Sequence, residues 1–164
     1  KGGKANRTRQ NISIYGSQDY KGTTVSGFSM VIIGNPMGKE RPRFARMGNF
    51  VKTYTPGKTK LRESEIQLRA KQLMTGKSLF AGALKVTMTA KFPIPKSWSK
   101  NKTKEAADRI LKPTTKPDLD NIAKLVLDAL NGIVYKDDSQ VVELNIRKFY
   151  TVGDCCIVLN IDKV

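Results

Sequence analysis

Alternation of apolar and polar residues marks the clearest predicted strand. From Leu84 to Phe92, in "ALKVTMTAKF", every second residue is apolar, which is the spacing of a half-buried strand. The apolar stretches "FSMVIIG" at 28–34, "VVELNIRKFY" at 141–150 and "CCIVLNI" at 155–161 predict three more strands. These elements predict a sheet at the centre of the fold.

Short connections are predicted between neighbouring strands. We expect the last two strands to form a hairpin across 151–154. Gly and Pro residues punctuate "MGKERPRFARMG", at 37–48, and predict a basic loop that carries one aromatic residue. The following "FVKTYTP" predicts a short strand that returns from this loop.

A different spacing, near 3.6 residues, predicts two helices. One is expected over 58–74, where Ile66, Ala70 and Met74 lie on one face. The other is expected over 120–131 and ends before Gly132, the usual residue after a helix. The apolar face of this second helix comprises Ile122, Leu125, Val126, Ala129 and Ile133.

The order β-α-β-α-β-β predicts an α+β fold, a small mixed sheet with two main helices packed on it. We assign 28–164 to this domain and 1–27, which is polar, basic and aperiodic, to a flexible tail. The long excursion at 93–117 holds the only tryptophan and many lysines, with a short helix expected over 99–111. Such a connection is usually functional or disordered, and we favour a DNA-facing flap.

Charge narrows the range of partners. Thirty Lys and Arg residues against fourteen Asp and Glu give a formal net charge of +16, which attracts polyanions. Nucleic acid is therefore the expected partner, and a basic protein without such a partner is the alternative. No apolar run is long enough to span a bilayer, so no membrane is expected.

The absence of histidine excludes several chemistries. A chain without histidine has no Ser-His-Asp or Cys-His catalysis and no histidine-ligated zinc. Hydrolysis would have to depend on carboxylates, lysine and a hard metal ion. Cys155 and Cys156 are adjacent and lack metal-ligand spacing, so we predict buried strand residues and a reducing cytoplasm.

Two aspartates stand where the second helix is expected to begin. They are Asp118 and Asp120 in "KPDLDNIAK", and Asp120, Lys124 and Asp128 form a row opposite the apolar face. Aspartates commonly cap helix starts, and Asp–Lys pairs one turn apart are ordinary surface ion pairs. For Asp120 alone this structural explanation is favoured, and Asp128 is assigned a plain surface role.

A second acidic pair favours a metal site over the purely structural explanation. "YKDDSQ" places Asp137 and Asp138 in the loop after the helix. Clustered carboxylates repel one another unless a cation lies among them, and Mg²⁺ prefers oxygen ligands. We therefore predict metal-assisted cleavage of phosphodiesters, with Lys124 balancing charge on the phosphate. Sequence spacing leaves open whether the two acidic pairs meet in space.

The stretch "KPDLDNIAKLVLDALNGIVYKDDSQVVE" resembles the signature of RusA-type Holliday junction resolvases. The segments "GNPMGKERPRFARMG", "YTPGKT" and "FPIPKSWSKNKT" are similar to the phage-like branch of that family. The resemblance covers roughly 30–161. The combination of DLDN-x-x-K with KDD-x-Q, in this order, is specific to the family.

This resemblance implies a homodimeric enzyme of recombination and repair that needs Mg²⁺ or Mn²⁺ and nicks four-way DNA junctions symmetrically. It implies that Asp118, Asp120 and Asp138 are the essential acids and Lys124 the essential lysine. Asp137 is a further candidate metal ligand. A non-catalytic nucleic-acid-binding protein and a nuclease for other branched DNA remain as alternatives.

The chain departs from some relatives just before the first aspartate. Lys116-Pro117 stands there in place of an arginine-rich run, so we expect the phosphate contacts elsewhere. For Phe44 and Trp98 we favour local packing. Insertion of either ring into the junction is the alternative. The predicted DNA-binding residues are Arg41, Arg43, Phe44, Arg46, Lys112 and Lys116.

Overall fold

The computed structural model describes residues 27–48 and 50–164. The predicted basic tail lies outside the described residues up to position 26. The described elements are β1 (Phe28–Ile33), β2 (Arg43–Met47), β3 (Phe50–Tyr54), α1 (Gly57–Met74), β4 (Leu84–Pro93), α2 (Lys100–Ala107), α3 (Leu119–Leu130), the 3₁₀ turn η1 (Asp138–Gln140), β5 (Val141–Thr151) and β6 (Cys156–Lys163). The α+β class is confirmed.

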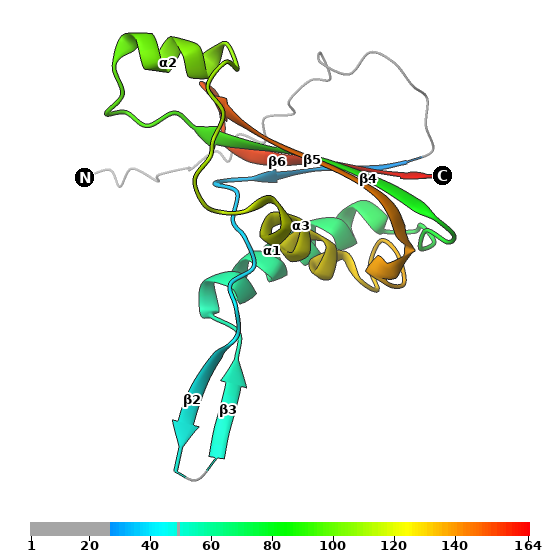
Figure 1. Cartoon of the computed structure of the whole chain (residues 1–164). Helices are drawn as coiled ribbons and strands as arrows, with labels where there is room; N and C mark the ends of the chain where they lie inside the picture. Colours follow the sequence, from blue (N-terminus) through cyan, green and yellow to red (C-terminus); the bar gives the residue numbers. More distant parts are fainter. Residues whose placement is uncertain (1–26, 49) are drawn as a thin grey trace, which may run out of the picture.

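The main sheet has the strand order β1-β6-β4-β5 (Figure 1). Strand β6 pairs antiparallel with both β1 and β4, whereas β4 and β5 are parallel. The predicted hairpin between β5 and β6 is therefore wrong, because β4 lies between them. The short connection at 152–155 crosses two strand spacings, about 10 Å, which a few residues span easily.

The loop predicted at 37–48 is also partly wrong. Its second half forms β2, which pairs antiparallel with the predicted short strand β3, from Arg43↔Tyr54 to Met47↔Phe50. This two-stranded hairpin projects away from the sheet and the main helices (Figure 1). Its strands are exposed along almost their whole length, so burial offers no sequence signal for them.

Helices α1 and α3 cover one face of the main sheet (Figure 1). The core lies between these helices and the sheet. Strand β1 shows the alternation of buried and exposed residues that a one-sided sheet requires. Helix α3 contributes most to it, with buried Ile122, Ala123, Leu125, Val126, Leu127, Ala129 and Leu130. Among the described helices, none is long and apolar enough to cross a membrane.

Lys39 connects the two covering helices. Its ammonium group forms ion pairs with Glu63 of α1, at 2.9 Å, and with Asp128 of α3. The three side chains are only 20–25% exposed. Burial alone would lower the pKa of Lys39, but the hydrogen bonds and charges of Asp128 and Glu63 outweigh it and raise that pKa.

We expect Lys39→Met to lower the free energy of unfolding by about 1–3 kcal/mol, because it leaves two carboxylates half-buried without a cation. Chemical denaturation measures this. Because the pKa of Lys39 is raised, its stabilisation is complete at neutral pH and is lost only above pH 10.5.

Lys60→Met, at an exposed position of α1, is the matched control, with an expected change under about 0.5 kcal/mol. Adding Glu63→Gln and Asp128→Asn to Lys39→Met should recover part of the loss. Equal stability of Lys39→Met and Lys60→Met would show that this ion-pair group contributes nothing.

Candidate active site

Asp118 occupies the N-cap position of α3, yet its carboxylate does not cap the helix. No side-chain hydrogen bond closes this helix start, and among the described residues the Asp118 carboxylate has no ion pair. Asp120 lies in the first turn, where its charge complements the helix dipole, and accepts a long hydrogen bond of 3.5 Å from Asn121. Both carboxylates are exposed to solvent.

Lys124 follows one turn later and is exposed. Neither Asp120 nor Asp128 forms an ion pair with Lys124 in the described part of the chain. Asp128 instead pairs with Lys39 and is partly buried, so it has a structural role in place of the plain surface role predicted for it. Ion pairing therefore explains Asp128 and does not explain the Asp118, Asp120 and Lys124 group.

The segment before β2 packs closely against the start of α3. A Cβ added at Gly38 would lie 2.9 Å from Asn121 Cβ and 3.0 Å from Pro117 Cβ, so only glycine fits there. The N–H of Lys39 donates to the carbonyl oxygen of Asn121 at 2.8 Å. This segment therefore fixes the position of the helix start.

Lys148 of β5 holds the same helix start from the other side. Its ammonium group donates to the carbonyl oxygens of Thr115, at 3.0 Å, and Pro117, at 3.1 Å. Pro117 directly precedes Asp118, so these two bonds set where the chain enters α3. A strand residue distant in sequence thus positions the candidate metal-binding acid.

The 93–117 excursion is attached to the neighbouring residues of β5. Trp98 packs edge-on against Tyr150, with ring centroids 5.0 Å apart, and Arg109 and Lys112 lie over the ring of Phe149. Local packing is confirmed for Trp98. Phe44 lies on the projecting hairpin and is 73% exposed, so the local packing predicted for it is wrong.

The second acidic pair lies in the tight turn η1. Asp137 is the N-cap of η1, and its carboxylate accepts a hydrogen bond from the N–H of Ser139 at 2.9 Å. Hydrogen bonds from Ser139, from the side chain and the backbone, lower the pKa of Asp137. Asp137 thus stabilises the turn, whereas the carboxylate of Asp138 forms no hydrogen bond or ion pair within the described residues.

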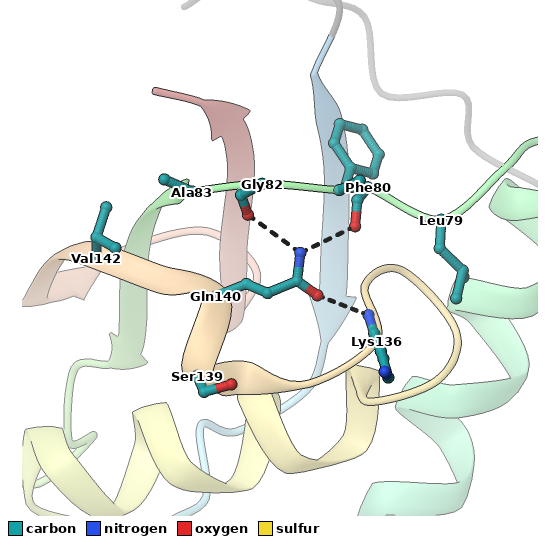
Figure 2. Close-up of a pocket in the computed structure, with 9 residues that line it drawn as sticks. Leu79, Phe80, Gly82, Ala83, Lys136, Ser139, Gln140 and Val142 are labelled. Carbon is teal, nitrogen blue, oxygen red and sulfur yellow. Dashed lines mark hydrogen bonds between the residues drawn. The ribbon is translucent and has the colours of Figure 1, made fainter.

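Gln140 holds this turn in place (Figure 2). Its amide nitrogen donates to the carbonyl oxygens of Phe80 and Gly82, both at 3.1 Å, and its carbonyl oxygen accepts from the N–H groups of Lys136 and Asp137. The side chain therefore ties the turn to the loop before β4. It also forms one wall of an open pocket beside that loop.

The two acidic pairs lie at opposite ends of α3 (Figure 1). Helix α3 has 12 residues, a length of about 18 Å, with Asp118 and Asp120 at its start and η1 beyond its end. The buried Tyr135 keeps η1 near that end, since its hydroxyl donates to Leu127 O at 2.9 Å. Among the described residues, no three Asp, Glu, Cys or His side chains form a group able to hold a metal ion.

The predicted DNA-binding residues fall in two places. Arg41, Arg43, Phe44 and Arg46 belong to the projecting hairpin or lead into it, and Lys112 and Lys116 lie between α2 and α3. Lys112 stacks its ammonium group on Phe149, 4.7 Å from the ring centroid. All six side chains are exposed, so each is accessible to DNA.

Three residues that position the candidate site were not identified from the sequence. They are Gly38, Lys148 and Gln140. Lys148 had a signal: it follows Val142, Leu144 and Ile146 at strand spacing, so a cation interrupts an apolar row. Gln140 lies inside the KDD-x-Q motif, but its role in holding η1 in place could be recognised only from the three-dimensional contacts.

Comparison with known proteins identifies the family. The family model described as Endodeoxyribonuclease RusA matches residues 34–159, which include both acidic pairs, Lys124 and the projecting hairpin. The chain belongs to the RusA endodeoxyribonuclease family. It resembles "Uncharacterized protein YqaN" of Bacillus subtilis (strain 168), with 40% identity over 122 residues that cover 73% of this chain and 85% of the relative.

We expect Gln140→Met to loosen η1 and to lower the free energy of unfolding by about 1–2 kcal/mol, because four backbone groups lose their partner. Hydrogen exchange should accelerate at the amide of Lys136. Gln140→Glu keeps the acceptor oxygen and loses the donor, so it should retain protection at Lys136 better than Gln140→Met.

Asn145→Ala, at an exposed position of β5, serves as the control and should leave exchange at Lys136 unchanged. Unchanged exchange at Lys136 in Gln140→Met as well would refute the role of Gln140 in holding η1.

Proposed function

We propose that this protein is a metal-dependent endonuclease that resolves four-way DNA junctions by paired, symmetric nicks, in recombination and repair in the cytoplasm. The observation that carries the proposal is the group at the start of α3. Asp118 stands at the N-cap of α3 without capping it, and Lys124, one turn after Asp120, forms no ion pair among the described residues. Ordinary helix stabilisation does not account for these side chains, and the family match covers all of them.

The donor chemistry at this helix start fits Mg²⁺ or Mn²⁺. Asp118 and Asp120 are exposed carboxylates, and Mg²⁺ commonly binds one or two carboxylates while it keeps several waters. Asp138 is the further ligand that we propose, and Asp137 is a weaker candidate because its carboxylate caps η1. A bound ion would supply a Lewis acid and an activated water for phosphodiester hydrolysis.

The side chains of the protein would bind the DNA and balance the charge on the phosphate. Lys124 is free to approach a non-bridging phosphate oxygen and to balance the charge that develops there. Lys112, Lys116 and the arginines near the projecting hairpin would hold the backbone of the DNA through phosphate contacts. The formal charge of +16 would concentrate DNA at this surface.

In a homodimer, acidic residues from two copies could meet although the two pairs of one chain lie apart. One chain keeps its pairs at the two ends of α3, but a two-fold axis can bring the start of one α3 near η1 of the other copy. Two such composite sites would also be related by symmetry, as two symmetric nicks require. We therefore propose that Asp138 of one copy completes the site of the other.

We expect the wild-type protein to cut a synthetic four-way junction only with Mg²⁺ or Mn²⁺, and Asp120→Asn to reduce the cleavage rate at least about 100-fold. The measurement is a single-turnover cleavage assay with end-labelled strands. Asp120→Asn should still bind the junction, because it loses an anion and no DNA contact.

Glu65→Gln, at an exposed position of α1, removes the same charge and should cut like the wild type. Cleavage by Asp120→Asn at the wild-type rate would overturn the site assignment. Tight binding without cleavage of any branched DNA by the wild type would favour a non-catalytic binding protein instead.

Mixing the variants tests the composite site. Asp120→Asn and Asp138→Asn should each be inactive alone, but a mixture should regain about a quarter of wild-type activity through mixed dimers, which hold one intact site. Single nicks should exceed paired nicks in that mixture. A mixture as inactive as its components, although mixed dimers form, would mean that each site lies within one chain.

A further inference from the structure

The β2–β3 hairpin, Arg43–Met47 with Phe50–Tyr54, carries large side chains that nothing in the described chain covers. Phe44 is 73% exposed and Phe50 is 80% exposed. Met47, Val51 and Tyr54 are also exposed. A projecting hairpin with so much exposed apolar surface is typical of a segment that meets a partner.

The cross-strand pairing distributes these side chains over both faces of the hairpin. Met47 pairs with Phe50 on one face, and Phe44 pairs with Thr53 on the other. One face of a hairpin would suffice for packing on the protein core. Aromatic rings on both faces instead suit a ribbon that is surrounded by its partner.

The charge of the hairpin indicates the chemistry of that partner. Between positions 41 and 54 the chain carries Arg41, Arg43, Arg46 and Lys52, and no Asp or Glu. Arg46 pairs across the strands with Val51, and Lys52 with Ala45, so cations also lie on both faces. Two such hairpins would repel each other, whereas a polyanion would be attracted to both faces.

We propose that the β2–β3 hairpin is the element that recognises the branch point of the DNA, with Phe44 and Phe50 stacking on bases and Arg46 and Lys52 contacting phosphates. This inference rests on the proposed junction endonuclease function. It extends that function by assigning the distinction between branched and linear DNA to one element, and by adding Phe50 and Lys52 to the DNA-binding residues.

Recognition by aromatic rings depends on where base faces are accessible. A continuous duplex stacks its bases on one another and offers only groove edges and phosphates. Stacking is interrupted at a branch point, and an exposed aromatic ring can then cover a base face. A two-stranded ribbon also has the width that a major groove admits, so the hairpin can approach along a groove.

Cations and aromatic rings should therefore contribute differently. Phosphates are present in every DNA, so Arg46 and Lys52 should strengthen binding to linear and branched DNA alike and set part of the salt dependence. Phe44 and Phe50 should strengthen binding to the junction alone. Tyr54 supplements the aromatic surface near the base of the hairpin, where it pairs with Arg43.

The experiment compares binding of a four-way junction and of a linear duplex of equal length, in EDTA so that no cleavage occurs, over a range of salt. The variant Phe44→Leu with Phe50→Leu keeps apolar side chains and removes the rings. It should weaken junction binding about tenfold, leave duplex binding within about twofold, and leave the salt slope unchanged. Arg46→Gln with Lys52→Gln should weaken both complexes and reduce the salt slope by about 2.

Matched controls lie on the exposed side of α1, where Leu68→Ala and Lys71→Gln remove an exposed apolar residue and an exposed cation. Neither should alter the preference for the junction. Thermal unfolding and circular dichroism show whether each variant is folded, and sedimentation velocity shows whether it keeps the oligomeric state of the wild type.

An unchanged junction preference in Phe44→Leu with Phe50→Leu would overturn the inference. A shift of that variant to a smaller oligomer would also overturn it, because the hairpin would then be an interface between copies of the chain. Failure of the proposed function is a separate result: the wild type would bind the junction and not cut it, while the binding comparison would still decide the role of the hairpin.

Discussion

The burial of one face of α3 is the constraint on which the rest of the molecule depends. Its apolar side chains lie against the sheet and against α1, so the helix cannot rotate without exposing them. That fixed rotation directs Asp120 and Lys124 to solvent and brings Asp128 to Lys39. The same helix separates the two acidic pairs by its own length. The directions of Asp120 and Lys124 therefore follow from hydrophobic packing that involves neither of them.

The two main helices were predictable because their signal is local. The expected ranges 58–74 and 120–131 differ by one residue from Gly57–Met74 and Leu119–Leu130, since apolar spacing and Gly132 mark them directly. Strand neighbours were not predictable in the same way. Strand β4 has a buried row on one face and needs a partner on each edge, but nothing in its sequence says that β5 and β6 are those partners. The hairpin β2–β3 was missed in part because both its faces are exposed.

The candidate site was predictable in composition and not in arrangement. Residue types drew attention to the two acidic pairs and to Lys124, because acids in a strongly basic chain are conspicuous, and the family resemblance selected Asp118, Asp120, Lys124 and Asp138 as candidates. Whether the chain returns to the start of a helix or stays at its end depends on the turn that follows. Here Tyr135 and Gln140 hold that turn at the far end. Their partners, Leu127 O and Phe80 O, are backbone atoms, which leave no trace in residue identity.

The attachment of the 93–117 excursion to β5 has a consequence for the edge of the sheet. Successive residues of a strand point to opposite faces, so Lys148 and Tyr150 contact the excursion from one face and Phe149 from the other. The excursion therefore wraps around the outer edge of β5 at its C-terminal half. Unprotected edges are where sheets of separate molecules join and aggregate. Only the first half of β5 remains open to such pairing, and there Glu143 is bound to Lys85 at 2.7 Å. The segment that leads into the start of α3 thus also covers part of one edge of the sheet, the other edge being β1.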